Sequence, residues 1–304
     1  MPLSHPFPPV PLPFPPQASA PDSPNEGDTY YSSTDKRVYV YDGVMWLPMP
    51  RRLDLVSGFV ASSTSSVRRG YTRSSDPTSA LQDFTVMCVF VPGSGENVDT
   101  NPKQVFGTRT GANGGGGGWS IQMNYASARG GNARIQYEVT QNASQLRSAG
   151  IDIPTMVGKA IVAHLSIRGS APSIRLYVNG SCVVSAAGGN TGAHTAGGNM
   201  CAGIYNDGSD SGGAGQFDGL IHGCGYATTA MTDAEIAAHA RAIIEGSLLV
   251  QTASGTALAD GWRVSEDDAD PDGTDWNSFL GGTALTTLNT TALTRSSRAQ
   301  VPWV

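Results

Sequence analysis

The amino-acid sequence predicts an all-β fold, a two-sheet antiparallel jelly-roll sandwich with one short helix, over residues 81–247. The chain of 304 residues holds 38 glycines and 19 prolines, which is typical of a protein with many turns. Short runs of β-branched and aromatic residues follow one another from residue 83 onward, and turn residues separate them. One later segment, 231–244, has the apolar spacing of a helix instead.

Nine β-rich runs define the strands of the predicted sandwich. The first, at 83–91, ends at Pro92 and Gly93, two residues that stop a strand. Asn179 and Gly180 separate two later runs and tolerate positive φ, so they predict a type I′ hairpin turn. The other candidate strands are 104–108, 119–125, 134–140, 160–168, 174–178, 181–185, 200–205 and 219–226.

The helix predicted at 231–244 has a recognisable start and end. Thr232 and Glu235 form a capping box, in which each side chain bonds the backbone N–H of the other residue. Ile236, Ala240 and Ile243 make an apolar stripe along one face, and a glycine at position 246 ends the helix.

Three stretches of this region are similar to the concanavalin A-like lectin and glucanase superfamily, in particular to its laminin G-like sandwiches. They read DFTVMCVFV, IRLYVNGSCV and FDGLIHGCGYATTAMTDAEIAAHA. The LYVNG hairpin of that family stands at 176–180, its strand start at 217–221 and its closing helix at 231–236. The resemblance implies the fold, but it does not choose a function, because this fold serves lectins, hydrolases and spacers alike.

The first 24 residues form a proline-rich segment with Phe7, Val10, Leu12 and Phe14 between the prolines. Such a segment cannot form a helix and adopts an extended, polyproline-type conformation. We interpret 1–24 as a docking arm, whose four apolar side chains anchor the chain in a groove of a partner protein. A passive linker is the alternative.

Residues 25–50 read as a small aromatic β module, a hairpin or meander with polar turns. The module resembles short units that recur in fibre, whisker and tail proteins of tailed bacteriophages. So small a unit buries too little surface alone and should pack on copies of itself or on a neighbour. The residues that carry the resemblance are Gly27, Asp28, Tyr30, Tyr31, Arg37, Tyr39, Tyr41, Asp42, Gly43 and Trp46.

Two further segments flank the predicted sandwich. Residues 51–80 are rich in serine, threonine and arginine and read as a linker that carries one or two strands. Residues 248–304 form a β-rich C-terminal extension with Trp262, Trp276 and Trp303. The extension either adds strands to the sandwich or reaches a neighbouring subunit, since an exposed terminal tryptophan is costly.

Carboxylates on the predicted strands are not arranged for sugar hydrolysis. Glycosidases of this superfamily carry an E-x-D-x-E pattern on one strand, because one carboxyl group attacks or stabilises the sugar and another donates a proton. Asp83 and Glu138 each lack an acidic residue two positions away, and we interpret His164 and His222 as structural. We expect a non-enzymatic protein. A carbohydrate-active enzyme that hydrolyses host polysaccharide, a glycan hydrolase or depolymerase, is the alternative.

Two acidic loops are candidates for calcium, and no other cofactor is expected. Asn206, Asp207 and Asp210 lie where laminin G-like domains often place a rim calcium or glycan site, although an ordinary glycine-rich turn is the preferred interpretation. A second loop, with Asp268, Asp270 and Asp272, has the opening of a calcium loop but holds phenylalanine at its twelfth position. The four cysteines have no metal-binding spacing and read as buried free thiols, with disulfides as the alternative.

Charge and hydropathy narrow the range of partners. A net charge of -6 and a pI near 5.3 leave no basic surface for nucleic acid. No apolar run is long enough to span a bilayer, and the N-terminus has no secretion signal, so we expect synthesis in a host cytoplasm without membrane insertion. Together the segments predict a fibre, spike or decoration protein of a tailed-phage virion. Its expected partners are other virion proteins, further copies of itself in a homo-oligomer and a host-surface glycan.

Overall fold

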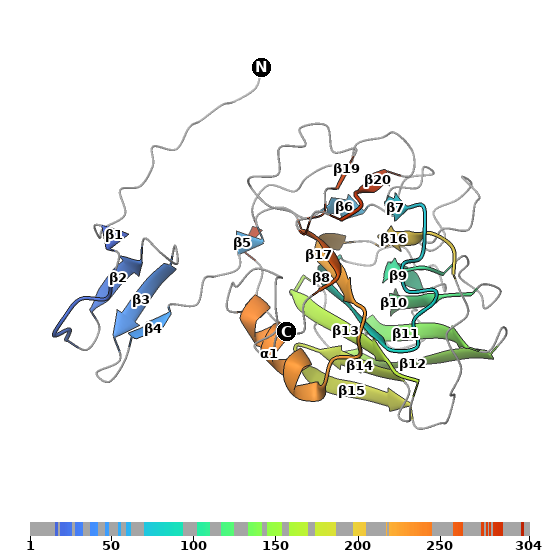
Figure 1. The fold of residues 1–304 in the computed structure, drawn as a ribbon, viewed down its shortest axis with the longest axis horizontal. Coiled ribbons are helices and arrows are strands. Elements are labelled where there is room, and N and C mark those ends of the chain that lie inside the picture. Colours follow the sequence, from blue (N-terminus) through green and yellow to red (C-terminus); the bar gives the residue numbers. More distant parts are fainter. Residues whose placement is uncertain are drawn as a thin grey trace, which may run out of the picture. The chain divides into compact units, whose positions relative to one another are not determined.

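The computed structural model divides the chain into two units, 1–52 and 53–304, each of which is described by itself (Figure 1). The structure does not describe every residue. In the first third of the chain, the positions outside the described residues are 1–15, 18, 26–27, 33–36, 42–45, 49–53, 56–58, 62–69 and 94–101. Further along the chain the same holds for 110–116, 125–132, 142–144, 154–157, 170–173, 187–196, 205–216, 218, 245–257, 264–274, 277, 279, 281, 288–298 and 301–304.

The first unit is a four-stranded sheet in the order β1-β2-β3-β4. Its strands are β1 (Pro16–Gln17), β2 (Thr29–Ser32), β3 (Arg37–Tyr41) and β4 (Trp46–Pro48). β2, β3 and β4 form the antiparallel meander that the aromatic pattern predicts, and Tyr30 stacks on Tyr39 with ring centroids 5.2 Å apart. β1 comes from the proline-rich arm and pairs with β2 in parallel.

The second unit is a sandwich of two antiparallel sheets, which confirms the predicted fold class. The larger sheet has eight strands in the order β12-β11-β10-β9-β16-β7-β20-β19. These are β12 (Gln145–Ile153), β11 (Ala133–Gln141), β10 (Trp119–Asn124), β9 (Lys103–Gly107), β16 (Met200–Ala202), β7 (Tyr71–Arg73), β20 (Leu285–Thr287) and β19 (Asp275–Trp276).

The second sheet has seven strands, six of which follow the order β15-β14-β13-β8-β17-β18. They are β15 (Ser181–Ala186), β14 (Ile174–Val178), β13 (Ile161–Ile167), β8 (Phe84–Pro92), β17 (Gly219–Ala227) and β18 (Asp260–Arg263). The seventh, β6 (Phe59–Ala61), also pairs with β17. Apart from these sheets, β5 (Asp54–Leu55) pairs with β21 (Ala299–Gln300).

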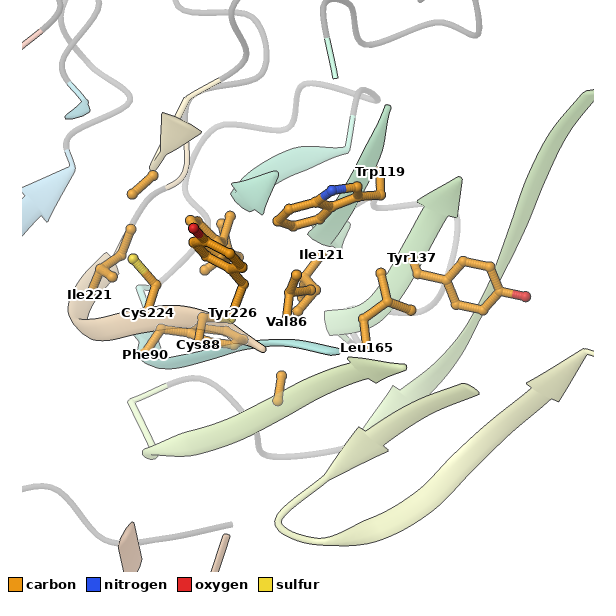
Figure 2. Packing of buried hydrophobic residues seen from close by; sticks show 14 of the residues in the cluster. Val86, Cys88, Phe90, Trp119, Ile121, Tyr137, Leu165, Ile221, Cys224 and Tyr226 are labelled. Carbon is orange, nitrogen blue, oxygen red and sulfur yellow. The ribbon is translucent and has the colours of Figure 1, made fainter. Parts of the chain in front are cut away.

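The main core lies between the two sheets and follows from strand alternation. Every residue of β8 is buried, because the strand is covered on both faces. Val86 and Phe90 point inward, where Trp119 and Ile121 of β10 belong to the same cluster (Figure 2). The alternating residues of β8, Met87 and Val89, point to the outer side of the seven-stranded sheet, while Cys88 points inward.

Helix α1 (Asp233–Ile244) covers that outer side and closes a second core. Its predicted capping box is present: Thr232 N donates to Glu235 Oε2 at 2.7 Å, and Glu235 N donates to Thr232 Oγ1 at 3.3 Å. The apolar stripe packs against the sheet, with Ile236 and Ala240 fully buried. The turn before β15 is also as predicted, with positive φ at Asn179 and at Gly180.

Both sheets include strands from the segments before residue 81 and after residue 247. β6 and β7 come from the segment predicted as a linker, and β18, β19 and β20 come from the C-terminal extension. Partly buried polar contacts join these additions: Arg73 Nη1 lies 3.1 Å from Asp260 Oδ2, and Trp262 Nε1 donates to the Thr283 carbonyl at 3.0 Å. Among the described residues no helix has the length and apolar character required to cross a membrane.

Candidate functional site

The outer face of the eight-stranded sheet is polar, in contrast to the face that α1 covers. On β10 and β11 the alternate residues Trp119, Ile121, Ile135 and Val139 enter the core, so their neighbours point outward. Each of these outward residues is polar. We call this surface the polar face, and it comprises Gln104, Ser120, Gln122, Asn124, Arg134, Gln136, Glu138 and Thr140.

A chain of hydrogen bonds links the amides of the polar face. Gln136 Nε2 donates to Gln122 Oε1 at 2.9 Å. Gln122 Nε2 in turn donates to Glu138 Oε2 at 2.8 Å and to Ser120 Oγ at 2.6 Å. The strand register explains this network, because Gln122 stands opposite Gln136 and Ser120 stands opposite Glu138 on the neighbouring strand.

Arg109 completes this network with a buried positive charge. Its Nε lies 3.2 Å from Glu138 Oε2, with the arginine side chain 0% exposed and the glutamate 8% exposed. A charge removed from water in this way needs its partner, since an unpaired buried ion is strongly destabilising. The carboxylate therefore serves at once as counter-ion to Arg109 and as acceptor for Gln122.

Gln104 extends the row of amides onto β9. It stands opposite Gln122 and is fully buried. Its Nε2 donates to the Ile204 carbonyl at 2.8 Å, while its Oε1 accepts no hydrogen bond in the part of the chain that the structure describes. A buried amide oxygen in this state retains the capacity to accept a hydrogen bond from a bound group.

Toward β12 the polar face becomes accessible to solvent. Arg134 Nη1 lies 3.6 Å from Asp152 Oδ1, with side chains 24% and 41% exposed, and Arg134 Nη2 donates to the Gly150 carbonyl at 2.9 Å. Ser148 is exposed on the same strand, opposite Glu138. We call Arg134, Ser148 and Asp152 the rim, because these side chains are accessible to solvent beside the buried amides.

This arrangement presents hydrogen-bonding groups of the kinds that pair with hydroxyl groups, and its two carboxylates, Glu138 and Asp152, lie far apart. Amide, carboxylate and guanidinium groups in fixed positions offer both donors and acceptors to a polyhydroxylated ligand. Hydrolysis needs two carboxyl groups about 5 to 10 Å apart. Asp152 stands opposite Arg134, four residues along β11 from Glu138, which separates the two carboxylates by roughly 13 Å along the strand.

A buried histidine pair lies on the opposite outer face, between the seven-stranded sheet and α1. His164 Nε2 of β13 and His239 Nδ1 of α1 lie 3.0 Å apart. Burial lowers the pKa of His164 well below its usual value, and the neighbouring His239 lowers it further. Burial also lowers the pKa of His239 to about 4. Both rings are therefore neutral near pH 7, which supports the structural interpretation of His164.

Three side chains from the seven-stranded sheet and its adjoining loop bind the start of α1. Tyr177 Oη donates to Asp233 Oδ1 at 2.8 Å, and Arg175 Nη1 donates to the same carboxylate at 2.6 and 2.8 Å. Arg168 Nη2 donates to the Met231 carbonyl at 2.8 Å. The hydrogen bond from Tyr177 is the main cause of the lowered pKa of Asp233. These contacts attach the helix, and none reaches the polar face.

The site residues predicted from the sequence lie outside the described residues. This applies to the anchor residues of the arm, the glycan or calcium rim and the second acidic loop: Phe7, Val10, Leu12, Phe14, Asn206, Asp207, Asp210, Asp268, Asp270 and Asp272. Within the described part of the chain, no group of three histidine, cysteine or acidic side chains could hold a metal ion. The polar face itself was visible in the sequence as a polar residue at every second position of 120–124 and 134–140.

The cysteines depart from the prediction at one position. Cys88, Cys201 and Cys224 are buried free thiols, as expected. The prediction was wrong for Cys182, which is exposed on the outer strand β15. Its neighbours Val183 and Val184 suggested a core strand, but an edge position leaves one side of the strand open to solvent.

Comparison with solved structures finds proteins of similar fold, and a match with a TM-score above 0.5 supports the two-sheet β-sandwich. A protein proposed to bind carbohydrate, from Bacteroides ovatus ATCC 8483, matches with a TM-score of 0.56 and 12% identity over 88% of this chain and 68% of that chain. A heptameric SAP-like pentraxin from Limulus polyphemus has a TM-score of 0.46 and 16% identity over 67% and 90% of the two chains.

A phage protein is also among the similar structures. The enzymatically active domain of tailspike protein 2 from bacteriophage CBA120 has a TM-score of 0.45 and 10% identity over 63% of this chain and 28% of that chain. Neither a family model nor a curated protein sequence matches the chain. At these identities the likeness concerns the fold.

Proposed function

We propose that the sandwich is a non-enzymatic glycan-binding module and that the polar face is its binding site. The observation that carries this proposal is the hydrogen-bonded row of Gln122, Gln136 and Glu138, which is bordered by the solvent-accessible side chains of Arg134 and Asp152. A site built to hydrogen-bond hydroxyl groups discriminates strongly against ligands that lack them, because its polar groups are then left unpaired.

The whole chain fits a structural protein of a tailed-phage virion, which we propose as its setting. The aromatic module with the phage-like motif forms an antiparallel meander in a unit of its own, and the proline-rich segment before it suits an anchor in a capsid or tail protein. Many copies on one particle would convert weak glycan binding into tight attachment to a host surface. The whole chain would then serve as a fibre, spike or decoration protein.

Glycan binding is tested by applying the full chain to an array of bacterial and host oligosaccharides. We expect at least one glycan to bind, and the rim variants Arg134→Gln and Asp152→Asn to weaken that binding about tenfold each, since each removes a hydrogen bond to a charged group. Arg241→Gln is the matched control, because Arg241 is an exposed arginine on α1. Equal binding by all three variants would contradict the proposal.

The enzymatic alternative has a separate test. A hydrolase would release reducing ends from the glycan that binds, and Glu138→Gln would abolish the release. We expect no release from any bound glycan.

The virion setting is tested by chemical cross-linking of intact phage particles that carry this chain. Cross-links from residues 1–24 to a capsid or tail protein are expected. Cross-links confined to the chain itself would contradict the anchor.

A further inference from the structure

Two of the four cysteines stand opposite each other in the centre of the seven-stranded sheet. Cys88 of β8 is paired in register with Cys224 of β17. Directly opposed residues of an antiparallel pair have Cα atoms about 4.5 to 5.5 Å apart and side chains on the same face. A disulfide needs Cα atoms about 4.4 to 6.8 Å apart, so the backbone already meets this requirement.

Both thiols point into the main core. Each is 0% exposed, and Figure 2 shows them in the cluster with Phe90, Ile221 and Tyr226. A disulfide is apolar and leaves no donor or acceptor unpaired, so this environment tolerates it as well as two thiols.

The remaining cysteines have no such partner. Cys201 stands opposite Thr72 on one side and Gly107 on the other, in the eight-stranded sheet. Cys182 stands opposite Tyr177 and is exposed. The strand register therefore selects a single pair out of the possible pairings.

We propose that Cys88 and Cys224 are a latent disulfide site, which a small-molecule disulfide such as oxidised glutathione closes while the chain folds. The thiolate of one cysteine attacks the glutathione disulfide, forming a mixed disulfide and releasing one glutathione thiolate. The second cysteine, also as thiolate, attacks the mixed disulfide and releases the other glutathione. Two protein thiols are oxidised, and one glutathione disulfide is reduced to two thiols that carry away the protons.

The folded dithiol resists this reaction. Burial raises the pKa of Cys88 and of Cys224, and the oxidant cannot reach either sulfur in the closed core. The state of the pair is thus set by the redox conditions during folding. Once formed, the bond joins the strands β8 and β17 and closes a long loop, which restricts the unfolded chain.

The test is to unfold the reduced protein in urea and refold it with oxidised glutathione. Intact mass and peptide mapping should show a peptide that links Cys88 to Cys224, a glutathione adduct at the exposed Cys182 and a free thiol at the buried Cys201. The urea midpoint should rise and return to its reduced value when a reductant is added to the unfolded chain. Protein kept folded in the same oxidant should react at Cys182 alone.

Cys224→Ala is the matched variant, in which the linked peptide and the rise in midpoint are both lost, while Cys182→Ser retains them. Should the unfolded chain fail to refold, the oxidant is applied at sub-denaturing urea, where local opening should yield the same linked peptide. Refolded or opened protein with Cys88 and Cys224 still reduced, or linked to other cysteines, would overturn the proposal.

Discussion

The two sheets of the sandwich share one core but differ on their outer faces. The seven-stranded sheet turns Met87, Val89 and Val162 toward α1 and buries them under the helix. The side chains of the eight-stranded sheet also alternate between the core and the outer face, but there the outward residues are amides, Glu138 and Arg134. Apolar residues on an outer face stabilise the fold, whereas a buried polar row is costly unless each group is paired. The pairings of Gln122 with Gln136 and of Arg109 with Glu138 offset this cost on the polar face.

The largest expected effect comes from the buried ion pair of the polar face. Glu138→Gln removes the carboxylate that lies 3.2 Å from the buried Arg109 Nε, so the free energy of unfolding should fall by about 3 to 5 kcal/mol. Urea unfolding measures this loss. Asp152→Asn, at the exposed rim, is the matched control and should change stability by less than about 0.5 kcal/mol. Similar losses for both variants would show that the buried and rim parts do not differ as described.

On the opposite face, Ile236→Ala removes a fully buried side chain between α1 and the sheet. The cavity and the lost apolar contact should cost about 2 to 5 kcal/mol in urea unfolding. Ile244→Ala, at a partly buried position of the same helix, should cost clearly less. Glycan binding of the folded Ile236→Ala variant should remain unchanged, and a loss of binding would mean that the two faces are coupled.

Acid should weaken the helix-covered face through its histidine pair. The pKa values of His164 and His239 are lowered in the folded protein, so below pH 6.5 the unfolded chain binds more protons. Stability from this source is complete above pH 6.5 and declines as the pH falls toward 4. His239 alone, with its pKa at about 4, accounts for about 3 kcal/mol.

The measurement is urea unfolding at a series of pH values from 7 to 4. A His164→Gln/His239→Gln double variant should lose most of the slope, because glutamine does not titrate, while His222→Gln should retain it. A wild-type slope that the double variant keeps would contradict this assignment.

The smallest effect concerns the start of α1. Thr232→Ala removes the hydroxyl that accepts the Glu235 N–H, and should cost about 1 kcal/mol in urea unfolding. The exposed Thr229 is the control, since Thr229→Ala should change stability by less than about 0.5 kcal/mol. Equal changes in the two variants would show that the cap contributes nothing.

Local sequence signals predicted the parts of the fold that depend on near neighbours. The Asn179-Gly180 turn and the Thr232-Glu235 cap each lie within a few residues, and both are present. β12 escaped prediction because Gly150 and charged residues interrupt its apolar alternation, and pairing with β11 supplies what the sequence lacks. The short strands β7 and β20 likewise depend on tertiary pairing.

The candidate site shows the same division between local and long-range information. Alternation alone places Gln122 and Gln136 on one side of their strands, so a polar face could be predicted. The network could not, because it depends on the register between β10 and β11 and on Arg109 reaching Glu138. The pairing of His164 with His239 spans 75 residues and a helix-to-sheet contact. A local sequence pattern therefore cannot predict this contact.

The central claim, that the polar face binds a glycan, is tested most directly by nuclear magnetic resonance. The side-chain amide signals of Gln122 and Gln136, assigned with single Gln→Ala variants, are followed while the glycan found on the array is added. Binding at the polar face should shift both signals with one common Kd and leave the backbone amides of α1 unchanged. Saturable binding that moves signals of α1 or of unit 1–52, and neither glutamine, would contradict it.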